Sequence, residues 1–154
     1  MAEHRIRFLI YPQPMPDHRL GTPLRLAHQA MRAATDAALR DRGLTAAQHA
    51  ILASVGEGGV GSNAALAARA GVTPQSAHEV LRVLEEHGLV ERPSGTGRGR
   101  AGEIRLTRAG RRALAGADAR VAAIEARVAE RLGEAQIHRL AELLGAATDA
   151  IAED

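Results

Sequence analysis

The sequence predicts a mainly α-helical protein with one small β-hairpin, and two observations carry that expectation. Over most of the 154 residues, apolar side chains recur at steps of three and four, which places them on one face of a helix. One later segment, residues 89–106, has short alternating runs on either side of a glycine-rich stretch, which is typical of a hairpin. The expected fold is therefore a set of helices with one hairpin inserted among them.

The first two helices begin at recognisable capping residues. Thr22 is a good N-cap and Pro23 suits the first helical position, so we expect a helix from there until Gly43. Thr45 opens the second helix, and Gln48 three residues later completes the pattern of a capping box. Both starts are predicted from local chemistry alone.

Two further helices follow a glycine-rich turn and lie close together in the sequence. The shorter one begins at Ser62 or Asn63 and ends before Gly71, which can adopt the left-handed conformation that closes a helix. Thr73 then caps the next helix and Pro74 occupies its first position. Two short helices joined by a three-residue turn that contains glycine form a helix-turn-helix.

A hairpin and long helices complete the chain. The second helix of the pair stops at Gly88, and residues 89–92 and 103–106 are expected to pair as strands around the loop 93–102. Thr107 caps a long helix, which Gly133 separates from a last one. A helix-turn-helix followed directly by a basic hairpin is a winged helix.

We expect one domain, residues 22–154, behind an irregular, proline-rich N-terminal extension at 1–21. Within it, residues 45–106 form the winged helix-turn-helix. Residues 22–40 and 107–152 form the dimerisation helices, and near-heptad apolar stripes on the last two helices favour a homodimer. The alternative is that these stripes pack within one chain. The dimer is preferred because the acidic last third, with net charge −4, has no obvious partner in a chain this small.

Composition narrows the function. All 20 basic residues are arginine, and the net charge is +2 over residues 1–59 and +4 over residues 60–112. The basic middle indicates an anionic partner. The absence of cysteine excludes disulfides and thiol sensing, and two aromatic residues are too few for base-stacking recognition of single strands. The apolar run at 8–11 is too short for a signal-peptide core, so we expect a cytoplasmic protein.

The helix-turn-helix supplies the candidate site. Leu66, Ala70, Val72, Ala77 and Val80 are expected to form its small core, which leaves polar side chains outward at the start of the second helix. Such side chains reach base edges in the major groove of double-stranded DNA, and arginines of the wing reach phosphates or the minor groove. The candidate DNA-binding residues are Thr73, Pro74, Gln75, Ser76, His78, Glu79, Arg82, Arg98 and Arg100.

Other function classes receive less support. The chain lacks a nucleophile elbow and a phosphate-binding loop in the right context, so we expect no enzyme activity and no cofactor. Seven histidines show no ligand spacing, so we expect no metal site, although a histidine-based metal sensor stays open as an alternative. A winged-helix module that binds proteins without DNA specificity is the other alternative.

From about residue 22 to its end, the chain resembles the MarR-type winged-helix transcriptional regulators. The matching positions are Leu44-Thr45, Gln48, Ile51-Leu52, Leu66-Ala67, Thr73-Pro74-Gln75-Ser76, His78, Leu84-Glu85, Gly88-Leu89-Val90-Glu91-Arg92, Arg100, Leu106-Thr107 and Gly110. The resemblance implies a homodimeric repressor on a pseudo-palindromic operator, often released by a small anionic or phenolic ligand. One departure stands in the wing, where the family commonly has Asp and this chain has Arg98.

The resemblance and the placement of three cationic side chains together suggest an effector site. His28 and Arg32 lie one turn apart on the first helix, and His49 lies on the second. They are candidate donors to a carboxylate or phenolate in an otherwise apolar pocket. Ordinary surface or interface roles for these three residues are an equal alternative.

Overall fold

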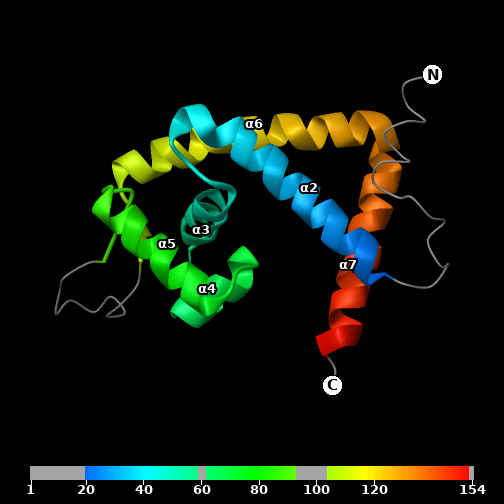
Figure 1. Ribbon diagram of the computed structural model, residues 1–154, viewed down its shortest axis with the longest axis horizontal. Coiled ribbons are helices and arrows are strands. Elements are labelled where there is room, and N and C mark those ends of the chain that lie inside the picture. Colours follow the sequence, from blue (N-terminus) through cyan, green and yellow to red (C-terminus); the bar gives the residue numbers. More distant parts are fainter. Residues whose placement is uncertain (1–19, 59–61, 93–103, 153–154) are drawn as a thin grey trace. The chain divides into compact units, whose positions relative to one another are not determined.

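The computed structural model describes residues 20–58, 62–92 and 104–152 (Figure 1). The chain forms two compact units, which divide between Ala33 and Ala34 inside the first described helix. The elements in chain order are α2 (Gly21–Leu39), the 3-10 turn η1 (Arg40–Arg42), α3 (Ala46–Gly56), α4 (Asn63–Ala70), α5 (Pro74–Glu86), β1 (Val90–Glu91), β2 (Arg105–Leu106), α6 (Arg108–Leu132) and α7 (Glu134–Ala152). The mainly α fold with a small hairpin is confirmed.

The start of α2 differs from the sequence-based expectation. The helix begins at Gly21, so Thr22 lies inside the first turn and is not the N-cap. The physical reason is that the backbone N–H of Leu24 already bonds to the carbonyl of Leu20, 3.2 Å away. Helical hydrogen bonding therefore begins before the threonine. The far end behaves as predicted, because Gly43 closes η1 with a φ of +65°.

The other predicted helix starts are confirmed by hydrogen bonds. Thr45 and Gln48 form a complete capping box at α3. The side chain of Ser62 accepts from the N–H of Ala65 and so caps α4, which decides between the two candidates. Thr107 caps α6 by accepting from the N–H of Gly110. Each cap satisfies an N–H group that the helix itself leaves without a partner.

The core of the second unit lies where α3, α4 and α5 pack against one another, and α6 also contacts α3. Apolar side chains fill it, as the helical periodicity predicted. Its fully buried large side chains are Leu39, Ile51, Leu52, Leu66, Leu81 and Leu84. Ser54 is a buried polar exception, and its hydroxyl donates to the carbonyl of Ala50 at 2.9 Å. That bond removes the cost of burying the hydroxyl.

The hairpin is shorter than predicted. β1 and β2 pair antiparallel over two residues each, with Val90 opposite Leu106 and Glu91 opposite Arg105. The predicted loop 93–102 lies outside the described residues. One further bond extends the ladder, because the N–H of Thr107 donates to the carbonyl of Leu89 at 3.0 Å. The root of the hairpin is thus joined directly to the start of α6.

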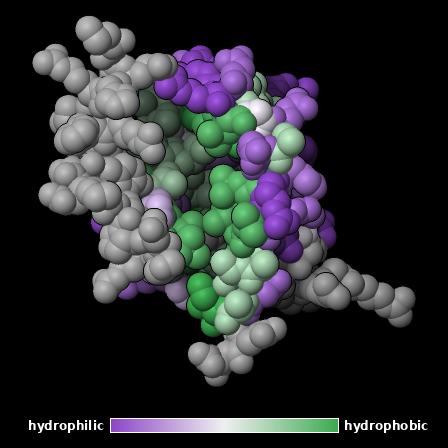
Figure 2. All heavy atoms as spheres, turned by 90° about the vertical axis from the view of Figure 1, so that its right-hand side faces the viewer, coloured by the Kyte–Doolittle hydropathy of each residue, from purple (hydrophilic) through white to green (hydrophobic). Residues whose placement is uncertain are grey.

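The two last helices differ in how much they bury. Ala117 and Ile124 of α6 are buried, whereas no residue of α7 is. Large apolar side chains stay exposed at the end of α6 and along α7: Leu132, Leu140, Leu143 and Ile151. Figure 2 views the side of the molecule that carries α7 and shows apolar side chains gathered there. Among the described residues, no helix is long and apolar enough to cross a membrane.

Candidate nucleic-acid interface

The helix-turn-helix forms as predicted. Gly71 closes α4 with a φ of +65°, and its N–H bonds back to carbonyls of the last turn. The N–H of Val72 bonds to the carbonyl of Ala67 at 3.0 Å, which completes a Schellman-like turn. Leu66 and Ala77 are buried, with Ala70, Val72 and Val80 packed partly buried against the core. The predicted small core is therefore confirmed, and it sets the angle between α4 and α5.

The start of α5 is an exposed, well-capped helix end. The Thr73 hydroxyl accepts from the N–H of Ser76 at 3.1 Å and donates to the Ser76 hydroxyl at 2.9 Å. Pro74 occupies the first helical position, as expected. The N-terminus of a helix carries positive dipole character and suits an anion such as a phosphate. Here it belongs to a 13-residue helix that the core holds by Ala77, Leu81 and Leu84.

The candidate reading residues lie outward along α5. Gln75, His78, Glu79 and Arg82 are exposed, and Ser76 is half-buried. Two of them have acidic neighbours one turn along the helix. The Gln75 amide lies 3.5 Å from a Glu79 carboxylate oxygen, and Arg82 forms an ion pair with Glu86. Exposed pairs of this kind are weak, so both side chains are able to exchange their partners for DNA.

Of the hairpin, the structure describes only the stem. Arg98 and Arg100 lie outside the described residues. The described stem places Arg92 beside α5, where its Nε lies 2.6 Å from an oxygen of Glu85. Glu85 is half-buried and bound to the stem, whereas Glu86 is exposed and pairs with Arg82.

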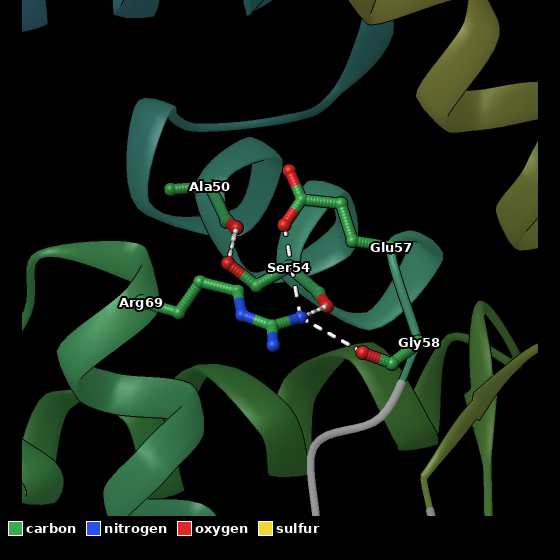
Figure 3. Close-up of polar contacts among 5 residues, drawn as sticks. All are labelled: Ala50, Ser54, Glu57, Gly58 and Arg69. Carbon is green, nitrogen blue, oxygen red and sulfur yellow. Dashed lines mark hydrogen bonds and ion pairs between the residues drawn. The ribbon is translucent and has the colours of Figure 1, made fainter.

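Arg69 links α4 to the end of α3, a role that the sequence pattern does not indicate. Its guanidinium, on α4, donates to the carbonyls of Gly58 at 2.8 Å and Ser54 at 3.3 Å. It also forms an ion pair with Glu57 at 3.6 Å (Figure 3). Helix ends leave carbonyls without intrahelical partners, and a cation there also opposes the negative end of the helix dipole. Arg69 therefore fastens the end of α3 to α4. Its place in the last turn of α4 gave no sign of this contact across the turn.

The candidate effector residues belong to different units. His28 and Arg32 are exposed on the part of α2 within the first unit. His49 is half-buried in the second unit, and its Nε2 lies 2.8 Å from Oδ1 of Asp118 on α6. Among the described residues, no group of three or more His, Asp or Glu side chains is placed to hold a metal ion.

The described helices and hairpin stem define a class: a winged helix-turn-helix protein with a long helical tail. A family model described as the MarR family matches residues 42–101. The HTH-type transcriptional repressor Rv2887 of Mycobacterium tuberculosis is 38% identical over 132 residues, which are 84% of this chain and 95% of that protein. The chain belongs to the MarR family.

Solved structures agree with this assignment. The crystal structure of M. tuberculosis Rv2887 in complex with salicylic acid aligns with a TM-score of 0.71 and 36% identity, over 87% of this chain and 99% of that one. Rv2887 in complex with DNA aligns with a TM-score of 0.64 and 33% identity, over 85% and 98% of the two chains. The M. tuberculosis transcriptional regulator MosR in complex with DNA gives 0.67 and 31%, over 87% and 98%.

Proposed function

We propose that this protein is a homodimeric, sequence-specific repressor that binds double-stranded DNA and is released by a small anionic or phenolic ligand. The observation that carries the proposal is the capped, outward-facing start of α5, with Gln75, His78 and Arg82 exposed along it. A helix held in this way by an apolar core is the element that enters a major groove in helix-turn-helix proteins. The DNA complexes of Rv2887 and MosR support the same reading.

Within α5, each candidate has a proposed role. The Gln75 amide pairs with the edge of an adenine, since an amide supplies one donor and one acceptor in the right geometry. Ser76 and His78 contact phosphate or a base edge, and Thr73 and Pro74 hold the helix start in place. Arg82 contacts phosphate after it leaves Glu86. In the wing, we propose phosphate or minor-groove contacts for Arg98 and Arg100.

The dimer is proposed to form through residues 22–40 and 107–152. The support is the apolar surface that one chain leaves uncovered on α7, where Leu140, Leu143 and Ile151 are 45%, 51% and 73% exposed. A hollow on α6 is lined by Ile124, Arg127, Val128, Arg131 and Leu132. Apolar side chains gathered on an exposed surface favour a protein interface. Two copies would place two α5 helices against successive major grooves, about 10–10.5 base pairs apart.

The effector is proposed to be a small aromatic acid or phenol, bound with help from His28, Arg32 and His49. Rv2887 has been solved with salicylic acid and with p-aminosalicylic acid, which supports this chemical class. Side chains that donate hydrogen bonds suit one carboxylate on an aromatic ring. Since a repressor acts on the chromosome, the proposed function also places the protein in the cytoplasm.

A salt series with matched duplexes tests the proposal. Binding is measured for the DNA upstream of the gene and for a scrambled duplex of the same composition. If Arg82, Arg98 and Arg100 of both protomers neutralise six phosphates, log affinity falls against log salt with a slope of about −5. Equal affinity for both duplexes would leave a non-specific binder, and no binding to either would favour the protein-interaction alternative.

Gln75→Ala sharpens the test. It should relax the preference at one base pair in each half-site, by about 1–3 kcal/mol, without changing the salt slope. Arg98→Ala/Arg100→Ala should flatten the slope and weaken binding to every sequence alike. His87→Ala is the control, because His87 is exposed at the opposite end of α5, outside both the candidate reading residues and the proposed dimer interface. It should change neither quantity.

A further inference from the structure

The end of strand β1 is tied to the helix proposed to read DNA. Arg92 directly follows β1, and its Nε lies 2.6 Å from Oε1 of Glu85, seven residues earlier on α5. The Glu85 side chain is 34% exposed and that of Arg92 42%, so the pair is partly shielded from water. A charged hydrogen bond of this kind is stronger than a neutral one and holds both groups in a defined direction.

The Glu85–Arg92 pair links a side chain of α5 directly to the end of β1, beside the apolar contacts that Val90 makes in the core. On the other side of the stem, the Thr107 hydroxyl donates to the carbonyl of Gly88 at 2.6 Å, which fixes the returning strand to the end of α5. The outgoing strand β1 carries one acidic residue, Glu91, which is exposed and lies opposite Arg105 in the ladder. Glu85 and Glu91 thus carry the same charge close to the same strand, and in the described structure Arg92 pairs with Glu85.

We propose that Glu85 and Arg92 are positioning residues for DNA recognition, in which the ion pair sets the direction of strand β1, the described stem of the hairpin, relative to α5. Arg92 is therefore not a phosphate contact, although it is an arginine at the base of a basic hairpin. The inference rests on the proposed function and deepens it, because it assigns a part in specificity to an acidic residue at the end of α5, three residues after Arg82. The wing and α5 have to reach two different parts of one duplex, so their relative direction decides whether both bind together.

The direction in which Glu85→Gln changes operator affinity distinguishes a positioning role of the ion pair from a general effect of charge. Glu85→Gln removes a negative charge from each protomer near a polyanion, so electrostatics alone would tighten binding and steepen the salt slope. If the ion pair positions the wing, the same substitution weakens operator binding about three- to tenfold and makes the slope shallower. Glu91→Gln is the matched control, since it removes the same charge from the same region without breaking the pair. It should bind as tightly as the unaltered protein or more tightly.

The charge swap Glu85→Arg/Arg92→Glu gives a second, independent readout. The double variant keeps the net charge and restores an ion pair with the two charges exchanged. Arg92→Glu alone should lose operator affinity. The double variant should recover at least half of that loss, measured on a logarithmic scale. A phosphate contact at Arg92 would leave the swap as weak as the single variant. Thermal unfolding of every variant identifies any that fail to fold. If Arg92→Glu is one of them, Arg92→Gln, which breaks the pair without adding a negative charge, serves as the single variant.

Two results would overturn the inference: equal tightening by Glu85→Gln and Glu91→Gln, or no recovery in the charge swap. Failure of the proposed function looks different, because the unaltered protein would then bind the operator no better than the scrambled duplex. The comparison of Glu85→Gln with Glu91→Gln is made at each salt concentration against both duplexes. Weakening by Glu85→Gln confined to the operator, with Glu91→Gln unchanged or tighter, supports the assignment.

Discussion

Nε2 of His49 on α3 and Oδ1 of Asp118 on α6 lie 2.8 Å apart. The bond joins the helix before the helix-turn-helix to the long helix after the hairpin, residues that are 69 positions apart in the chain. His49 is a proposed donor to an anionic effector, and Asp118 already occupies one of its ring nitrogens with a carboxylate. An effector carboxylate that uses the same nitrogen has to displace Asp118.

The first prediction concerns removal of the Asp118 carboxylate. In Asp118→Ala, His49 Nε2 is freed, so the affinity for salicylate should rise by about three- to tenfold, the range expected for losing a partly exposed pair. Isothermal titration calorimetry of salicylate into the protein measures this affinity. Glu125→Ala on the same helix removes the same charge, and the described structure shows no ion pair for it. If both variants shift the affinity equally, general electrostatics explains the effect and His49 has no special role.

Arg69 provides a prediction about stability. Arg69→Met leaves the carbonyls of Ser54 and Gly58 without their shared donor, so unfolding should become easier by about 1–2 kcal/mol. Arg69→Lys should recover part of this, because an ammonium group donates to a carbonyl but lacks the wide guanidinium. Urea unfolding at fixed protein concentration measures the loss. Arg112→Met is the control on exposed α6, and a loss there equal to that of Arg69→Met would remove the special role of the contact.

Gly110 marks a close approach between α6 and the chain before β1. A Cβ at this position would lie 1.9 Å from the carbonyl oxygen of Leu89, which is backbone and cannot move aside cheaply. Gly110→Ala should therefore cost about 1–3 kcal/mol or more. Gly145→Ala on α7, where nothing lies within 4 Å of the added carbon, should be neutral or stabilising because alanine favours helices. Thermal unfolding measures both variants. A larger loss of stability in Gly145→Ala than in Gly110→Ala would contradict the close packing at Gly110.

The dimer surface is tested with one charge on α7. Leu140→Glu puts a carboxylate into the exposed apolar face, so the protein should become monomeric at micromolar concentration and lose operator binding. Ala135→Glu places the same charge about half a turn around the helix, away from Leu140, and should leave the dimer intact. Sedimentation velocity measures both. A stable dimer of the Leu140→Glu variant would show that α7 does not form the interface by this face.

Much of the fold was predictable because its signals are local. A threonine or serine before an apolar repeat caps the nearest N–H groups whatever lies elsewhere, so Thr45, Thr73 and Thr107 were identified correctly. Thr22 shows the limit of this reasoning. Its side chain has the right chemistry, but the helix extends past it because an earlier carbonyl, that of Leu20, is already bonded.

In the candidate site, too, some features follow from local sequence and others only from the folded structure. The capped helix, its polar face and its apolar anchors are properties of one continuous segment, and periodicity alone therefore determined that Gln75 lies outward and Ala77 inward. Which polar side chains are engaged was decided by the tertiary structure, since Glu85 with Arg92, Arg69 with Gly58, and His49 with Asp118 meet only after the chain folds back. The strength of such contacts depends on distance and burial, and a sequence specifies neither for residues on different elements.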